Sequence, residues 1–205
     1  MKYGLFFGDS ITYGEYYGVF GGWVDILKRF ALQKYNEGSD ELILFNLGIG
    51  GETSEGLVKR IQNEMSTGNA EDGNIIFIGY GANDLAVKDG NQIVNSRQFK
   101  ANIEKAIQQA KVFSKEIYLV SILPVSDRID SKISSTGKIR TNEDVLVYNQ
   151  ILKNIATENA LNYIDFYSAF SENKEILLSK DGVHPNEKGY EMMAEIALPI
   201  IDKYL

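Results

Sequence analysis

The sequence contains no cysteine and only one histidine, and its acidic residues outnumber its basic ones. Without cysteine the chain cannot form disulfides, use a thiolate nucleophile or bind a metal through a thiolate. The 21 lysines and arginines stand against 28 aspartates and glutamates, which gives a net charge of -7. This balance argues against nonspecific binding to nucleic acid, because contacts to phosphates need a basic surface.

The sequence also lacks any apolar run near the ~20 residues that a membrane helix requires, so we expect no membrane span. Lys2 is followed by only a few apolar residues before Asp9, which is short for a secretory signal. We find no internal repeat and no linker rich in proline or serine. We therefore expect a cytoplasmic protein whose 205 residues form one domain, residues 1–205.

Apolar runs of strand length recur along the chain and show no clean alternation with polar residues. This pattern is typical of strands covered on both faces, as in a parallel sheet. The expected strands are Tyr3–Phe7, Leu42–Leu47, Ile75–Ile78, Ile117–Leu123 and Tyr163–Phe166.

Between these runs, apolar residues repeat at helical spacing, as in Trp23, Ile26, Leu27 and Phe30. Alternating strands and helices predict a three-layer α/β/α domain of the α/β class, with a mostly parallel five-stranded sheet. A last helix follows Pro185, and we expect Pro199 to bend or end it. The polar segment 124–140 is long for a loop, which leaves two interpretations open, a functional lid or a disordered insertion.

Polar and glycine-rich motifs follow the predicted strands, at the places where a parallel α/β sheet binds its ligands. The first strand ends in Gly8-Asp9-Ser10, and the second runs into NLGIGGETS at residues 46–54. The third ends in GYGAND at 79–84, and KDGVHPNEKGY at 180–190 precedes the final helix. These motifs should converge on one rim of the sheet.

The only histidine, His184, lies three residues after Asp181 in the sequence Asp-Gly-Val-His. One short loop can hold the carboxylate against ring atom Nδ1, which leaves Nε2 as an acceptor for a serine proton. Alone, Ser10 is better explained as a helix cap and His184 as a surface residue. Together with Asp181, however, they supply the nucleophile, base and orienting acid of acyl transfer.

Acyl transfer also needs hydrogen-bond donors for the developing oxyanion. Gly51 can bring its backbone N–H close because it has no side chain, and Asn83 can offer its side-chain amide. The N–H of Ser10 would be the third donor. Considered singly, Gly51 and Asn83 are equally well explained as turn residues.

Taken together, GDSIT, NLGIGGETS, GYGAND and DGVH resemble the SGNH hydrolases, also called GDSL-type esterases or lipases. The resemblance spans Gly8 to His184 and implies a flavodoxin-like fold. It implies that Ser10 is the nucleophile, His184 the base and Asp181 the orienting acid. It also implies an oxyanion hole formed by Ser10, Gly51 and Asn83. The expected chemistry requires no metal and no organic cofactor.

The expected substrate is a small carboxylic ester, such as an O-acetyl group on carbohydrate. We assign Asp9, Tyr16, Tyr17 and Val183 to the substrate pocket, because tyrosine offers a flat face and a hydroxyl to an amphipathic ligand. A lysophospholipase or thioesterase with a longer acyl groove is the alternative. A noncatalytic binding protein of the same fold and an FMN binder are less favoured, because the catalytic set is complete and an FMN site would leave His184 idle.

Overall fold

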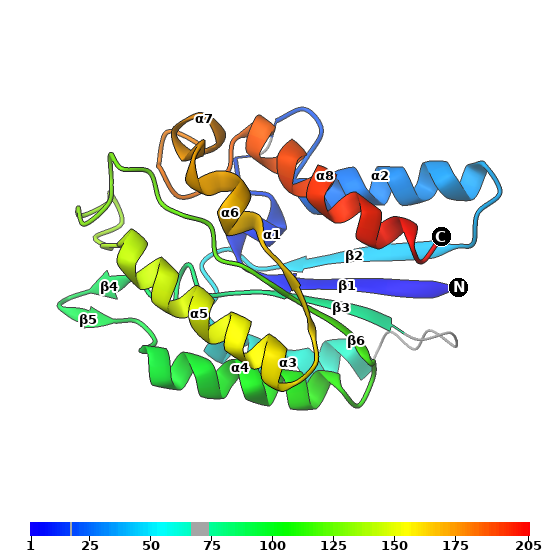
Figure 1. The fold of residues 1–205 in the computed structure, drawn as a ribbon, viewed down its shortest axis with the longest axis horizontal. Helices are drawn as coiled ribbons and strands as arrows, with labels where there is room; N and C mark the ends of the chain where they lie inside the picture. The colour runs from blue at the N-terminus through cyan, green and yellow to red at the C-terminus, as the bar shows by residue number, and fades with distance from the viewer. Residues whose placement is uncertain (17, 67–73) are drawn as a thin grey trace.

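Five parallel strands form the central sheet in the computed structural model, which describes residues 1–16, 18–66 and 74–205. Their order is β2-β1-β3-β6-β7 (Figure 1). The strands are β1 (Lys2–Gly8), β2 (Leu42–Gly48), β3 (Asn74–Gly79), β6 (Glu116–Val120) and β7 (Asn162–Ile164). A separate antiparallel hairpin consists of β4 (Val87–Lys88) and β5 (Asn91–Gln92).

Helices follow most of the strands, as the alternating pattern of the sequence predicts. They are α1 (Ser10–Tyr13), α2 (Trp23–Asn36), α3 (Ser54–Ser66), α4 (Ser96–Ala110), α5 (Asn142–Glu158), α6 (Phe166–Ser171), α7 (Lys174–Leu177) and α8 (Glu187–Asp202). Helices α3, α4 and α5 cover one face of the sheet, and α2, α6 and α8 cover the other (Figure 1). The predicted three-layer α/β/α arrangement with a parallel five-stranded sheet is therefore confirmed.

Both faces of the sheet are apolar, which explains why the strands show no alternation with polar residues. Successive side chains of a strand point to opposite faces. Leu5 and Phe7 pack with α3, α4 and α5, whereas Phe6 stacks on Phe77 and packs with Trp23 of α2. All four aromatic side chains are at most 1% exposed, so each face has its own core.

Two predicted strands end earlier than their apolar runs suggest. Strand β6 stops at Val120 instead of Leu123, because the amide of Asn149 in α5 bonds both backbone groups of Ile122. The last strand stops at Ile164, because Asp165 accepts a hydrogen bond from Ser168 N and caps α6. Phe166, predicted to be in the strand, begins that helix instead.

Pro199 does not end the final helix, since α8 continues through it to Asp202. Proline has no backbone N–H, so the carbonyl of Glu195, four residues earlier, lacks its helical donor; both residues lie on the exposed face of α8. Water can replace the missing donor there. None of the helices in the described residues is long and apolar enough to cross a membrane.

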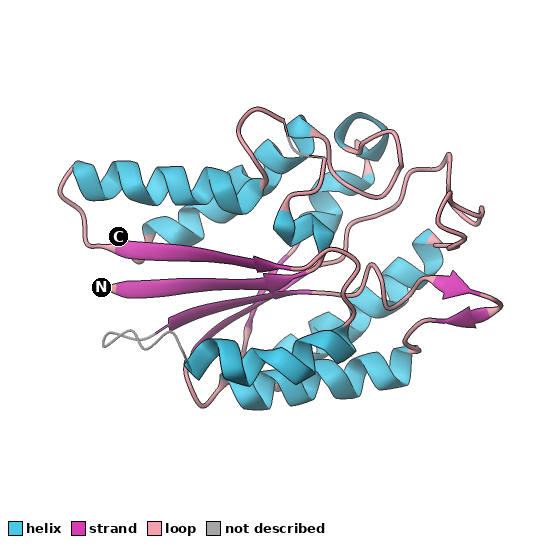
Figure 2. Cartoon of the chain, turned by 180° about the vertical axis from the view of Figure 1, so that it is seen from behind, coloured by secondary structure: helices cyan, strands magenta, loops and turns pink. Residues whose placement is uncertain are grey.

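Strands β1, β2 and β3 end in register on Gly8, Gly48 and Gly79. A side chain at Gly48 would collide with the backbone of Tyr13, 2.2 Å from the position of its Cβ. The glycine therefore lets the short helix α1 lie directly on the strand ends. Figure 2 shows the arrowheads of these strands pointing toward the loops that carry the predicted site residues.

Candidate active site

Ser10 begins α1, immediately after β1 ends at Gly8. The side chain of Asp9 caps this helix by accepting a hydrogen bond from Ile11 N at 2.9 Å, and Gly14 ends it with a left-handed φ of 94°. Because Asp9 provides the cap, the hydroxyl of Ser10 is not needed for that role. Ser10 is 7% exposed, and its Oγ lies 2.7 Å from His184 Nε2.

The loop between α7 and α8 brings His184 to Ser10 across 174 positions of sequence. Asp181 Oδ2 lies 2.5 Å from His184 Nδ1, while Asp181 Oδ1 accepts hydrogen bonds from the backbone N–H groups of Val183 and His184. Burial opposes ionisation of Asp181, but the hydrogen bonds and the charge of His184 outweigh it and lower the pKa of this carboxyl. An ionised Asp181 keeps the proton on Nδ1 and leaves Nε2 as the acceptor that faces Ser10.

The loops after β2 and β3 meet beside Ser10. Gly51 adopts a left-handed φ of 77°, a conformation that favours glycine, and Asn83 Nδ2 donates to the carbonyl of Glu52 at 3.2 Å. Asp84 joins the two loops from below, because both the N–H and the hydroxyl of Ser54 donate to its carboxylate. Asp84 is 0% exposed, and this burial raises its pKa to about 6.

A cleft of about 680 Å³ opens above these groups. Most of the residues predicted from the sequence line it, and they are Ser10, Tyr16, Gly51, Asn83, Asp181, Val183 and His184. The ring of Tyr16 lies edge-on to the imidazole of His184, with 5.1 Å between the ring centroids. The remaining predicted pocket residue, Tyr17, lies outside the described residues.

Asp9, also assigned to the substrate pocket from the sequence, is not part of the lining of this cleft. Its side chain lies beneath the cleft, 3% exposed, where it caps α1. Burial raises the pKa of Asp9 to about 6, even though hydrogen bonding by Ile11 and the charges of His184 and Arg140 oppose the shift.

Segment 124–140 forms one wall of the cleft, through residues that include Ile133, Lys138 and Arg140. Its backbone is fixed to the hairpin, because Val87 and Ile139 exchange two hydrogen bonds of 2.8 and 2.9 Å. This finding favours a structured wall over the predicted alternative of a disordered insertion.

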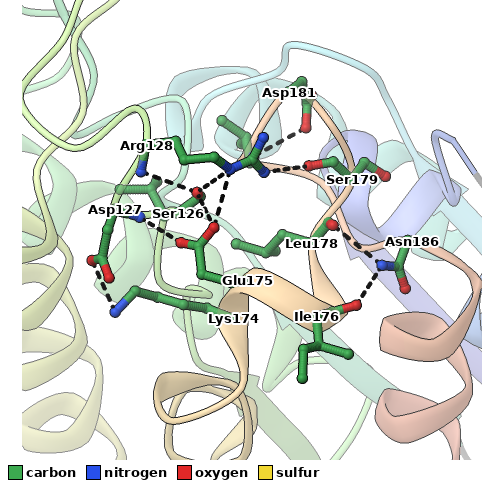
Figure 3. A network of polar contacts seen from close by, with 12 residues as sticks. Ser126, Asp127, Arg128, Lys174, Glu175, Ile176, Leu178, Ser179, Asp181 and Asn186 are labelled. Carbon is green, nitrogen blue, oxygen red and sulfur yellow. Dashed lines mark hydrogen bonds and ion pairs between the residues drawn. The ribbon is translucent and has the colours of Figure 1, made fainter.

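A polar network connects this wall to the loop of His184 (Figure 3). Glu175 of α7 accepts hydrogen bonds from Ser126 Oγ, from Asp127 N and from Arg128 Nε at 2.7–3.0 Å. Ser126 N in turn donates to the carbonyl of Gly182, between Asp181 and His184. The network therefore supports the loop that presents the imidazole.

Three residues near the site were not singled out from the sequence. Glu15 Oε2 lies 3.7 Å from His184 Nε2, and Lys138 and Arg140 both contact Asn83 Oδ1. Glu15 follows the first motif closely, but Lys138 and Arg140 lie in a loop without periodic pattern. Nothing in their local sequence connects them to Asn83.

Known proteins share both the sequence pattern and the fold. The profile of one family, described as GDSL-like Lipase/Acylhydrolase, matches residues 5–197. The chain is 26% identical over 208 residues to the spore germination lipase LipC of Bacillus licheniformis, covering 92% of this chain and 91% of that protein. It is 26% identical over 212 residues to the isoamyl acetate-hydrolyzing esterase of Saccharomyces cerevisiae, covering 98% and 86%.

A solved structure extends the similarity to three dimensions. The crystal structure of a member of the lipolytic protein G-D-S-L family from Veillonella parvula superimposes with a TM-score of 0.75. The two sequences are 27% identical, and the match covers 99% of this chain and 100% of the other.

Proposed function

This chain belongs to the GDSL-like lipase/acylhydrolase family, and we propose that it hydrolyses small carboxylic esters through an acyl-enzyme on Ser10. The observation that carries the proposal is the hydrogen-bonded series from Ser10 Oγ through His184 to Asp181. A serine is a weak nucleophile until a neighbouring base accepts its proton, and the base must itself be oriented. This arrangement meets both requirements.

In the proposed mechanism, His184 Nε2 takes the Ser10 proton as Oγ attacks the ester carbonyl. The N–H groups of Ser10 and Gly51 and the amide of Asn83 stabilise the resulting oxyanion. His184 then protonates the leaving alcohol, and the carbon–oxygen bond to that alcohol breaks. Water attacks the acyl-enzyme with His184 again as the base, which releases the acid and restores Ser10.

The walls of the cleft support a short acyl group and a polar alcohol. Beneath Ala82 and Val183 lies a mostly apolar void of about 10 Å³. This space is about the size of one water molecule and cannot take a long chain. The wall formed by segment 124–140 and Lys180 carries hydroxyls and cations, at Ser134, Ser135, Thr136, Lys138 and Lys180. Such a wall suits an O-acetylated carbohydrate, and acetate is the acyl group named for the yeast relative.

A panel of p-nitrophenyl esters from acetate to palmitate tests the proposal. We expect kcat/KM to be highest for acetate and to fall steeply with chain length. Ser10→Ala should lower kcat at least ~10³-fold because the nucleophile is gone. Ser39→Ala is the matched control, since Ser39 lies between α2 and β2 at the amino ends of the strands.

Two results would contradict different parts of the proposal. Ester hydrolysis by Ser10→Ala at the rate of the unaltered protein would remove Ser10 as the nucleophile. A preference for palmitate would retain the nucleophile but replace small esters by long-chain lipids, the alternative expected from the sequence.

A further inference from the structure

Arg140 ends the wall of the cleft as a buried cation, 8% exposed. Its guanidinium donates from Nε to the carbonyl of Ala82 at 2.8 Å and from Nη2 to Asn83 Oδ1 at 3.3 Å. Among the described residues no carboxylate forms an ion pair with it. Burying a charge is costly unless its hydrogen bonds compensate. The charges of Asp9 and Asp181 also favour the charged guanidinium, but both of its side-chain hydrogen bonds go to the loop of Asn83.

The groups around Asn83 determine which way its amide points. Arg140 and Lys138, whose Nζ lies 3.4 Å from Asn83 Oδ1, have donors only, so the oxygen of the amide must face them. On the other side the carbonyl of Glu52 can only accept, so the amino group must face it. The second N–H of that amino group is then available to the cleft. A flipped amide would place its amino group against the donors of Arg140 and Lys138 and its oxygen against the carbonyl oxygen of Glu52.

We infer that Arg140, assisted by Lys138, is a positioning residue of the oxyanion hole that orients the Asn83 amide and polarises it. A cation at the carbonyl oxygen draws electron density from the amide and strengthens its N–H groups as donors. The inference rests on the proposed function, in which Asn83 donates to the oxyanion. Arg140 acts through Asn83 and does not touch the ester.

A double-mutant cycle with p-nitrophenyl acetate tests this role. Asn83→Ala alone should lower kcat by about 10²–10³-fold, as for loss of one oxyanion donor. Arg140→Met alone should lower kcat by about 10-fold, with KM changed less than about 3-fold. In the Asn83→Ala background Arg140→Met should change kcat by less than about 2-fold, because the group through which it acts is already gone.

If Arg140→Met lowers kcat equally in the unaltered protein and in Asn83→Ala, the inference is overturned, and Arg140 only stabilises the structure of the cleft wall. An unchanged kcat in Arg140→Met would overturn it as well. Should circular dichroism show Arg140→Met to be unfolded, Arg140→Lys replaces it in the cycle. A lysine keeps the charge but cannot reach Ala82 O and Asn83 Oδ1 together. Arg140→Lys should therefore lower kcat less than Arg140→Met, and this decrease should again require Asn83.

Lys132→Met is the matched control, because Lys132 is an exposed cation of the same segment whose Nζ donates to Arg128 O. Its kcat should equal that of the unaltered protein. Ser10→Ala separates the two levels of the argument. Retained activity in Ser10→Ala would contradict the proposed function. If Ser10→Ala is inactive but the effects of Asn83→Ala and Arg140→Met on kcat are additive, only the role of Arg140 is contradicted.

Discussion

Ser10, Gly51 and Asn83 are held from beneath by buried polar groups, whereas the loop of Asp181 and His184 is held by a network whose charged groups are open to solvent. Asp84, which joins the loops of Gly51 and Asn83, is 0% exposed. In the histidine network, the side chains of Arg128 and Glu175 are 54% and 41% exposed. The interactions that hold the Ser10, Gly51 and Asn83 side of the site are therefore buried, and the ion pair that holds the His184 side is exposed.

Buried and exposed polar interactions differ in how much they contribute to stability, because water screens exposed charges. A buried carboxylate without its donors costs free energy, so Asp84 and Ser54 are strongly coupled. Water and salt screen the exposed ion pairs, which typically contribute about 1 kcal/mol or less each. We therefore expect the oxyanion side to be sensitive to single substitutions and the histidine side to tolerate them outside Asp181 and His184.

The largest effect in this comparison should come from Asp84→Ala. The substitution leaves the N–H and hydroxyl of Ser54 without acceptors in a buried site, which should lower the free energy of unfolding by ~2–4 kcal/mol. Because the Gly51 and Asn83 loops lose their connection, kcat should fall about 10-fold. Urea denaturation and esterase kinetics measure the two changes. A destabilisation well below ~1 kcal/mol would show that this side is not held by Asp84.

A smaller effect, with a pH signature, is expected for Asp9→Asn. Burial raises the pKa of Asp9 to about 6, from 3.8, so the folded state takes up a proton more readily than the unfolded state. The charged form therefore costs stability above about pH 6, and this cost is lost as the pH falls toward 4. Asparagine keeps an acceptor for Ile11 N without the charge.

Denaturation at several pH values measures this prediction. Asp9→Asn should stabilise the fold by ~1–3 kcal/mol at pH 8, and its advantage should shrink steadily between pH 7 and pH 4. An advantage that does not vary with pH would contradict a buried, ionised Asp9. Asp84, whose pKa is also raised to about 6, remains in both proteins, but the charge of Asp9 contributes to that shift. Removing this charge relieves Asp84 as well and adds to the advantage of Asp9→Asn at high pH.

The smallest effect should come from Glu175→Ala, the matched counterpart of Asp84→Ala. It removes a carboxylate that also joins two loops of the site, but one that is itself open to water, as are its partners Asp127 and Arg128. Only its third partner, Ser126, is buried. We expect a destabilisation below ~1 kcal/mol that decreases further at high salt, with kcat within about 3-fold. A loss as large as that of Asp84→Ala would erase the contrast between the two sides.

The fold and the residues at the strand ends could be predicted because they depend on local patterns. Apolar runs gave the five strands, and motifs at the ends of parallel strands must meet at one edge. The early end of β6 could not be predicted, because Asn149 takes over the backbone groups of Ile122 from a distant helix. Arg140 was missed for the same reason, since its partner Asn83 is 57 positions away.

The central claim, that His184 activates Ser10 as a nucleophile, is tested most directly by intact-mass measurement after reaction with a fluorophosphonate. We expect the unaltered protein to gain one phosphonyl group, located on Ser10 by peptide mapping. His184→Ala should react much more slowly, and Ser10→Ala should not react at that position. Labelling of another residue, or equal rates with and without His184, would contradict the account.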